Sequence, residues 1–308
     1  MDITQDQLQA YAARDPHLVY HLTLDEADLE TRCPLDNGRH SIRPRESLGQ
    51  LDVLPFELLS DILLTLDLPT LTVFRRVNFQ AMHVVNSLHQ YKMISKHCIN
   101  VLRAAVSLEA ASFDCRTLYE TLRTRKCGNC HRFGSYLYLI TCKRVCYFCF
   151  SSTLKFRPMS AKDAARFSGL PMQDLMHLPH VMSLAGRYSW FGKIPPRRRD
   201  LLMPKRRTLL FDAQAVLDTV SGGWSDESQK RIWNLDPMTR EPTRYMSIIT
   251  APYFNSSGCL SYWGFYCTKC RGHKGAVDRS RNKYTEDEFL GHIGQHEAAN
   301  INQRLIDG

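Results

Sequence analysis

The sequence lacks any apolar run long enough to cross a membrane. Its longest apolar stretch, Tyr136–Cys142, covers seven residues, whereas a transmembrane helix needs about 20. The opening residues, MDITQDQLQAY, are polar and acidic, so they have neither the basic start nor the apolar middle of a secretory signal. We therefore expect a protein of the nucleus or the cytoplasm that has no membrane partner.

Motifs for nucleotide binding and hydrolysis are also missing. The sequence has no Gly-x-Gly-x-x-Gly, no Walker A loop and no Gly-x-Ser-x-Gly, which are local signatures of dinucleotide, nucleoside triphosphate and acyl-transfer chemistry. His296-Glu297 is followed by Ala-Ala-Asn, so the His-Glu-x-x-His motif of metalloproteases is absent as well. We expect a protein that is not an enzyme.

The composition is that of an ordinary globular chain. The 308 residues include 44% hydrophobic and 23% charged side chains, which excludes disorder throughout and suggests about two structural units. Lysine and arginine number 40 against 31 acidic residues, for a net charge of +9. This surplus permits contact with nucleic acid but does not require it.

Cysteine, in contrast, is plentiful and clustered. Eight of the 11 cysteines fall within residues 127–149 and 259–270. The number is odd and no export signal is recognised, so disulfides are not expected. Clustered thiols in a reducing compartment are more often metal ligands.

The first cluster consists of two Cys-x-x-Cys turns, Cys127/Cys130 and Cys146/Cys149, with fifteen residues between them. Four thiolates satisfy a tetrahedral zinc ion, and a strand-like run, Ser135–Cys142, separates the two turns. The spacing predicts a structural Zn²⁺ ion near 127–149. Cys142 is interpreted as a packing residue, although it is an alternative to Cys146 as a ligand.

The second cluster pairs a cysteine turn with two histidines: Cys267, Cys270, His292 and His296. The histidines are four residues apart, so they share one face of a predicted helix. The order resembles a zinc finger in outline, although twenty-one residues separate Cys270 from His292, more than in a compact finger. The pattern predicts a second structural Zn²⁺ ion near 267–296, with Cys259 and His273 as alternative ligands.

Neither cluster matches a catalytic zinc site. Catalytic zinc usually has three protein ligands and an open position, whereas each cluster offers four. The His-x-Glu and Pro-Cys-x-x-Cys pattern of zinc deaminases is missing. After Cys149 no cysteine occurs until Cys259, which disfavours a RING module with its eight ligands.

Helical periodicity dominates the first half of the chain. Leucines recur at helical spacing through residues 51–98, and the pattern stays helical from Val101 to Arg125. Pro55 suits the first turn of one helix, Asp67-Leu68-Pro69 separates it from a second, and a third helical run begins near Gln80.

The second half mixes strand and helix patterns. Ser135–Cys142 has strand chemistry and is predicted to be a hairpin arm, and residues 246–267 are aromatic and β-like. Helices are predicted at Ala161–Phe167, at Arg207–Val220 and at Thr285–Ala299, the last with Thr285 and Glu288 as a capping box.

Two basic stretches lie between these elements. Arg197-Arg-Arg199 and Lys205-Arg-Arg207 place six positive charges within residues 197–207, which suggests a nuclear import signal, a nucleic-acid contact or a solvated loop. A second group surrounds the second cysteine cluster: Lys269, Arg271, Lys274, Arg279, Arg281 and Lys283.

Residues 51–77, LDVLPFELLSDILLTLDLPTLTVFRRV, resemble an F-box. The shared features are an opening Leu-Pro, paired leucines, a second Pro-x-Leu and an Arg-x-Val. The tryptophan that an F-box carries soon afterwards is missing, and Phe79-Gln-Ala-Met82 stands there. The segment Cys127–Cys149 resembles the cysteine-rich region that follows the F-box in many F-box proteins of filamentous fungi. The terminal Cys-x-x-Cys with a histidine-bearing helix is similar to that group as well.

The resemblance implies a substrate-receptor subunit of a Skp–cullin–F-box ubiquitin ligase. Its F-box would bind the Skp adaptor protein, and through it cullin, while the remaining chain would hold an unknown protein substrate. The residues expected to contact the adaptor are Leu51, Leu54, Pro55, Leu58, Leu59, Ile62, Leu63, Leu66, Pro69, Leu71 and Val77. The alternative is a zinc-dependent regulatory protein that binds nucleic acid.

The expected organisation has three parts. Residues 1–48, broken by Pro34, Asn37-Gly38 and Pro44, are interpreted as a flexible leader, with a short docked helix as the alternative. Residues 49–98 form the F-box, a three-helix module. Residues 99–308 form a cysteine-rich substrate-receptor region, so the fold class is α+β and mainly helical.

Overall fold

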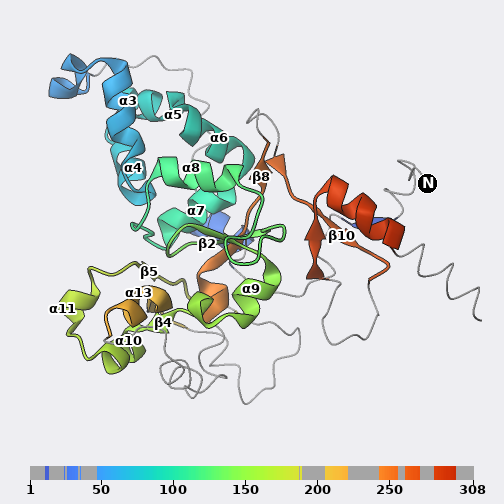
Figure 1. Ribbon diagram of the computed structural model, residues 1–308. Coiled ribbons are helices and arrows are strands. Elements are labelled where there is room, and N and C mark those ends of the chain that lie inside the picture. Colours follow the sequence, from blue (N-terminus) through green and yellow to red (C-terminus); the bar gives the residue numbers. More distant parts are fainter. Residues whose placement is uncertain are drawn as a thin grey trace, which may run out of the picture.

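The computed structural model describes residues 11–13, 24, 26–33, 35, 47–186, 188, 205–220, 243–255, 261–270 and 281–295. These residues form a helical body followed by small sheets with their own helices (Figure 1). The α+β class expected from the sequence is therefore confirmed. Among the described helices, none has the length and apolarity needed to traverse a bilayer.

The helical body consists of short helices around one apolar core. The 3-10 turn η2 (Gly49–Val53) is followed by α3 (Phe56–Leu64), α4 (Leu68–Arg75), α5 (Phe79–Ser87), α6 (His89–His97), α7 (Ile99–Ser107) and α8 (Cys115–Arg123). The helical pattern predicted over this region is confirmed, but the elements are shorter. The run near Gln80 is divided at the buried, extended Leu88, and the next run is divided between residues 108 and 114.

Side-chain caps fix where several of these helices begin. In α4, α5 and α8 the preceding residue accepts a hydrogen bond from the backbone N–H three residues on, at 2.8, 2.8 and 2.7 Å respectively: Asp67, Asn78 and Asp114. Each cap satisfies an N–H group that the first turn of a helix leaves without a partner. Such a cap starts α8 as a new helix rather than as a continuation of α7.

Helix α2 (Glu26–Arg32) comes from the segment interpreted as a leader. Its Leu29 is fully buried in the main core. Arg103 Nη2 on α7 donates to Glu30 Oε1 at 3.2 Å, and Arg32 Nη2 donates to the Ala185 carbonyl at 3.0 Å. This part of residues 1–48 is a docked helix, which the sequence offered as the alternative.

The central sheet has the strand order β3-β2-β7. Strands β2 (Tyr136–Tyr138) and β3 (Lys143–Val145) form an antiparallel hairpin, and β7 (Ile248–Thr250) pairs antiparallel with the other edge of β2. The hairpin arm predicted at 135–142 is confirmed in its first half, while residues 139–142 form the connection to β3. The aromatic, β-like region thus returns to the core of the molecule.

A buried arginine joins this sheet to α8. Arg144 on β3 is 3% exposed, and its guanidinium donates at 2.6–3.5 Å to five carbonyl oxygens, those of Thr121, Leu122, Gly134, Ala251 and Pro252. Burial lowers the pKa of Arg144 to about 10, so the group stays charged at neutral pH. It therefore holds the C-terminal end of α8, the start of β2 and the end of β7 around one positive charge.

A second small module lies below the central sheet in the view of Figure 1. Its sheet has the order β4-β6-β5, with β4 (Met159–Ser160), β5 (His180–Met182) and β6 (Leu209–Phe211). Helices α10 (Ala161–Ser168), α11 (Met172–Leu175) and α13 (Ala213–Asp218) pack with it around a separate apolar cluster.

The single helix predicted at Arg207–Val220 is wrong in its first half. Leu209–Phe211 form β6, which pairs with β4 on one side and β5 on the other, so tertiary pairing overrides the helical pattern. Asp212 then caps α13, because its Oδ2 accepts from the Ala215 N–H at 2.9 Å. The helix predicted at Ala161–Phe167 is confirmed as α10.

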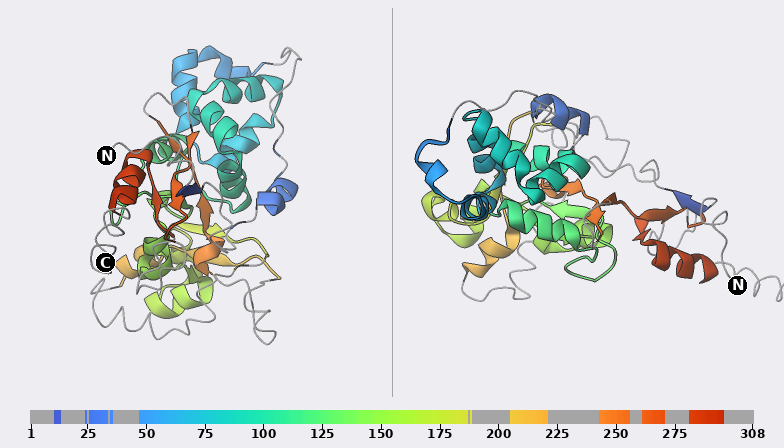
Figure 2. Two further views of the ribbon diagram at one scale, coloured as in Figure 1. Left: turned by 90° about the vertical axis from the view of Figure 1, so that its right-hand side faces the viewer. Right: turned by 90° about the horizontal axis from the view of Figure 1, so that it is seen from above.

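The C-terminal module lies to one side of the central sheet (Figure 2). It contains β1 (Ala12–Ala13), β10 (Phe265–Cys267) and β11 (Lys283–Tyr284) in the order β1-β10-β11, with a helix at 286–295. The predicted capping box is confirmed, since the Thr285 N–H donates to Glu288 Oε2 at 3.0 Å and the Glu288 N–H donates to Thr285 Oγ1 at 3.4 Å. Residues 296–299 of the predicted helix lie outside the described residues.

Replacing Arg144 with methionine tests its role in the fold. Methionine keeps the apolar length of the side chain but leaves buried carbonyl groups without their donor, so the free energy of unfolding should fall by roughly 3 kcal/mol or more. The matched control is Arg123→Met on the exposed surface of α8, for which we expect a change of about 0.5 kcal/mol. Urea unfolding followed by circular dichroism measures both, and similar losses for the two variants would contradict the role of Arg144.

Candidate metal centres

The first cysteine turn is closed by its own backbone. The Cys127 N–H donates to the Arg132 carbonyl at 2.7 Å, and the His131 N–H donates to the Cys127 carbonyl at 3.0 Å. His131 adopts a positive φ of 62°, a left-handed conformation that histidine tolerates better than most residues. The Gly128 N–H donates to the Arg144 carbonyl at 2.9 Å, which fastens the turn to β3.

The second cysteine turn is the start of a helix. Cys146 is the N-cap of α9 (Tyr147–Ser152), and Cys149 lies in its first turn. At the other end of α9, the buried Arg244 donates through Nη1 to the carbonyls of Phe150 and Thr153 at 2.8 and 2.6 Å. The helix is therefore held at its N-terminal end by the cysteines and at its C-terminal end by an arginine.

These two turns bring four sulfur atoms together. The Sγ atoms of Cys127, Cys130, Cys146 and Cys149 all lie within 4.8 Å of one another, and those of Cys130 and Cys146 are 3.4 Å apart. A tetrahedral site with metal–sulfur bonds of about 2.3 Å places its sulfur atoms about 3.8 Å apart. The four cysteines can therefore hold a metal ion.

Asn129 supports this group from the turn itself. Its backbone N–H donates to Cys127 Sγ at 3.4 Å, and its side-chain Nδ2 donates to Cys149 Sγ at 3.3 Å. One residue thus contacts a sulfur of each turn. The cysteine spacing alone did not indicate Asn129, whose local signal in the sequence is its position between the two cysteines of the first turn.

The electrostatics of the group favour a cation. The neighbouring Cys146 thiol lowers the pKa of the Cys127 thiol, assisted by backbone N–H groups such as that of Asn129. The proximity of Cys127 in turn raises the pKa of Cys146 far above its ordinary value, and burial raises the pKa of Cys149 to about 11. A cation bound between the sulfur atoms would favour their thiolate forms.

Cys142 lies outside the four-sulfur group. It is buried at the end of the β2–β3 connection with a φ of 52°, and its Sγ is 3.6 Å from Thr121 Oγ1 on α8. Burial raises the pKa of its thiol to about 12. This environment agrees with the interpretation of Cys142 as a packing residue.

The second cluster is brought together in part. Ligand atoms of Cys267, Cys270 and His292 lie within 4.8 Å of one another, with Cys270 Sγ 3.2 Å from His292 Nε2. His292 stacks on Tyr284 with ring centroids 4.5 Å apart, which orients its imidazole toward the cysteines. These three residues can hold a metal ion, while His296, Cys259 and His273 lie outside the described residues.

Aromatic contacts attach the C-terminal module to the first centre. The Arg281 guanidinium lies over the ring of Tyr147, with its carbon 4.7 Å from the ring centroid, and donates to the Tyr147 hydroxyl. Tyr147 is the residue that follows Cys146. The hydroxyl groups of Tyr136 on β2 and Tyr266 on β10 are also hydrogen-bonded to each other. The two candidate metal centres are therefore linked through packed side chains.

The basic stretch at 197–207 lies largely outside the described residues. Its described end, Arg207, donates to Glu109 Oε1 at 2.7 Å and to the carbonyls of Ser107 and Met182 at 2.7 and 3.1 Å. Arg207 therefore joins β5 to the C-terminal end of α7, which is a structural role.

The residues predicted to bind a partner divide by exposure. Three are buried in the core of this chain: Leu59, Leu63 and Leu71. Three are half-buried: Leu54, Leu66 and Pro69. Five are exposed: Leu51, Pro55, Leu58, Ile62 and Val77.

Further exposed apolar side chains accompany them, and the sequence did not single these out. We use the term apolar ridge for the large hydrophobic residues that are exposed between residues 51 and 79: Leu51, Val53, Phe56, Leu58, Ile62, Val73, Val77 and Phe79.

No protein-family model, no curated protein and no solved structure matches this chain. A functional assignment therefore has to rest on the geometry of the two cysteine groups and on the apolar ridge.

Metal content tests the first centre directly. Cys146→Ser removes one of four ligands, so we expect the purified protein to lose about one metal ion per chain relative to the unmodified protein. Cys142→Ser is the matched control, because this cysteine is buried nearby but bonds to Thr121, and its metal content should not change. Mass spectrometry of dissolved metals measures both, and an unchanged content in Cys146→Ser would contradict the assignment.

Proposed function

We propose that the chain is a non-catalytic adaptor of the F-box type, a substrate receptor of a Skp–cullin–F-box ubiquitin ligase. The observation that carries this proposal is the apolar ridge. It lies on the segment whose sequence resembles an F-box. The resemblance implies that this segment binds the Skp adaptor protein.

Helix α3 is apolar on two faces. Leu59 and Leu63 are 5% and 3% exposed and pack into the core, whereas Leu58 and Ile62 are 53% and 50% exposed. A surface helix of a soluble protein normally keeps its outer face polar. The outer face of α3 is therefore suited to pack against another protein, because burial there would remove apolar side chains from water.

The segments next to the outer face of α3 in the chain also expose apolar side chains. Phe56, at the start of α3, is 50% exposed, and Val73 and Val77, on α4 and just after it, are each 66% exposed. Apolar side chains at helical spacing are the usual anchors when a helix binds in a groove. In the proposed complex the groove belongs to the Skp adaptor, and cullin joins through that adaptor.

The two metal groups have a structural role in this proposal. We propose that each holds one Zn²⁺ ion, because thiolate and imidazole donors in tetrahedral sets of four suit zinc. For the second centre the sequence offers His296 as the fourth ligand. Zinc in the two centres would hold the region after α8 in one conformation, so that it can bind a protein substrate. Ubiquitin transfer itself would be carried out by the conjugating enzyme that the complex positions nearby.

Substitution on the ridge tests the adaptor assignment. Leu58→Glu combined with Ile62→Glu places two charges on the outer face of α3, and we expect the affinity for the Skp adaptor to fall about 100-fold or more. Co-purification and calorimetry with the adaptor measure the effect. Because both side chains point to solvent, metal content and unfolding should stay as they are in the unmodified chain.

The matched control uses another pair of exposed apolar residues four positions apart. Met172 and Met176, at α11, are each 43% exposed, and Met172→Glu with Met176→Glu should leave adaptor binding unchanged. Adaptor binding that survives in the α3 variant, or that is lost equally in the α11 variant, would remove the support for this surface.

Cobalt substitution tests whether the metals are structural. Two closed four-coordinate centres should give intense visible absorption that does not change when azide is added, since no coordination position is open. A spectrum that shifts with azide would indicate an exchangeable position and would favour a metalloenzyme instead.

A further inference from the structure

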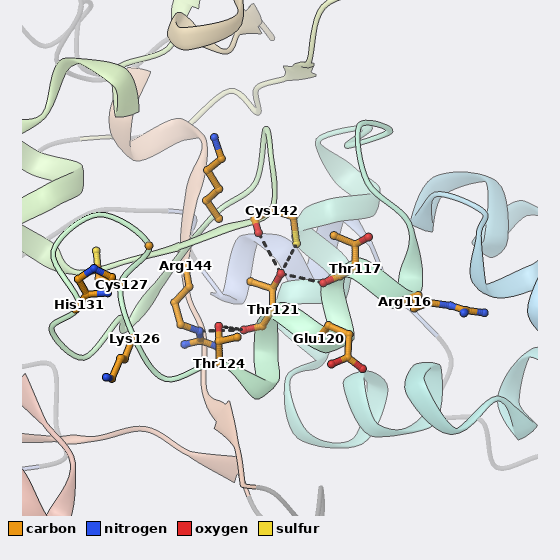
Figure 3. Close-up of a pocket in the computed structure, with 12 residues that line it drawn as sticks. Arg116, Thr117, Glu120, Thr121, Thr124, Lys126, Cys127, His131, Cys142 and Arg144 are labelled. Atoms are coloured by element: carbon orange, nitrogen blue, oxygen red, sulfur yellow. Dashed lines mark hydrogen bonds between the residues drawn. The ribbon is translucent and has the colours of Figure 1, made fainter.

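A groove of about 650 Å³ lies between α8 and the first metal centre. Figure 3 shows Thr117 and Thr121 of α8, with Thr124 just after this helix, along one side. Cys127 and His131 of the cysteine turn lie at the other end, and Arg144 lies between them. The start of β3, including Lys143, completes the lining. Its size falls within the usual range for sites that bind small ligands or a few side chains.

The walls of this groove are fixed by hydrogen bonds. Thr121 Oγ1 donates to the carbonyls of Thr117 and Cys142 at 2.8 and 3.2 Å, and Thr124 Oγ1 donates to the Thr121 carbonyl at 2.8 Å. Arg144 adds its bond to the Thr121 carbonyl at 3.2 Å. Because α8 and β3 are tied together in this way, the groove exists without a ligand and need not form on binding.

The groove carries a concentration of positive charge. Residues 116–144 contain seven lysine and arginine residues and a single acidic residue, Glu120. Lys126 and Lys143 line the groove and are exposed. In the described part of the chain neither forms a salt bridge, although the Asp212 carboxylate interacts electrostatically with Lys143. Glu120 pairs with Arg123 at 3.3 Å, which partly neutralises the one carboxylate. A zinc ion with four thiolates would carry a formal charge of about −2, which leaves the surplus positive.

We propose that this groove binds an acidic or phosphorylated segment of a protein, with Lys126 and Lys143 pairing with its carboxylate or phosphate groups. The proposal rests on the proposed function, because it makes this groove the place where the receptor holds its substrate. Lysine pairs with carboxylates and phosphates through charge-assisted hydrogen bonds. The walls formed by α8 and β3, which hydrogen bonds hold together, would orient the bound segment.

A peptide fits the groove better than a nucleic acid does. Proteins that bind single-stranded nucleic acid stack its bases on aromatic side chains, and among the described residues that line this groove none is Phe, Tyr or Trp. Nucleic-acid binding also uses a charged track that follows several phosphates, whereas Arg116, at the far end of the groove, is paired with Asp61 at 2.8 Å. The charge available to a ligand is therefore concentrated at Lys126 and Lys143.

Fluorescence anisotropy with the full-length protein tests the proposal. The probes are labelled peptides of one length with degenerate flanks and a centre of two glutamates, two phosphoserines, two alanines or two lysines, together with a mixed-sequence single-stranded DNA. The groove variant is Lys126→Gln with Lys143→Gln. The matched control is Lys162→Gln with Arg166→Gln, an exposed basic pair on α10.

We expect the unmodified protein to prefer the glutamate or the phosphoserine peptide to the alanine and lysine peptides, and the two acidic probes distinguish the source of the charge. In the groove variant the affinity for the preferred probe should fall about tenfold or more, and in the control it should stay the same. Absence of any preference for acidic peptides, or equal affinity in both variants, would overturn the proposal. DNA that binds more tightly than every peptide and is weakened by the groove variant would overturn it in favour of nucleic acid.

Folding and the adaptor role are checked separately. Single Lys126→Gln should retain its metal content and still weaken peptide binding, so a loss caused by misfolding of the double variant is recognised. The variant Leu58→Glu with Ile62→Glu should bind acidic peptides normally. The two proposals can therefore fail separately. If the chain does not bind Skp but binds acidic peptides, the adaptor assignment fails, and if it binds Skp but not acidic peptides, the groove proposal fails.

Discussion

The convergence of four sulfur atoms is the constraint that fixes the segments around the β2–β3 hairpin against each other. It joins the turn at 127–130 to the N-terminal end of α9, two segments that flank the β2–β3 hairpin. Four neighbouring thiolates would repel one another, and a cation held between them would remove that repulsion. The proposed metal ion would therefore couple the local fold to metal binding, as in other small metal-binding modules.

Two buried arginines extend that constraint into the rest of the molecule. Arg144 gathers carbonyl groups from α8, from the start of β2 and from the end of β7. Arg244 does the same at the C-terminal end of α9. Gly134 shows how closely the parts fit, because a Cβ added there would lie 2.5 Å from Cγ of Arg144. The helical body differs from this region, since its helix α3 keeps apolar side chains in contact with solvent.

The sequence predicted the parts of this structure that depend on local chemistry. Cysteine spacing identified all four members of the first centre, helical periodicity located α3, α4 and α10, and Thr285 with Glu288 marked the start of the last helix. It could not identify features that depend on distant partners. Leu209–Phe211 form a strand only because β4 and β5 flank them, and nothing local distinguishes Arg144 from exposed arginines. The exposure of Leu58 beside the burial of Leu59 likewise requires the packed helices.

Hydrogen–deuterium exchange of the full chain, measured with and without a metal chelator, tests the central claim most directly. The account predicts that metal removal increases exchange most in residues 127–156 and in β7, the segments joined through the sulfur atoms and the two arginines, and far less in α3 and α4. Unchanged protection of residues 127–156 after complete loss of metal would contradict it.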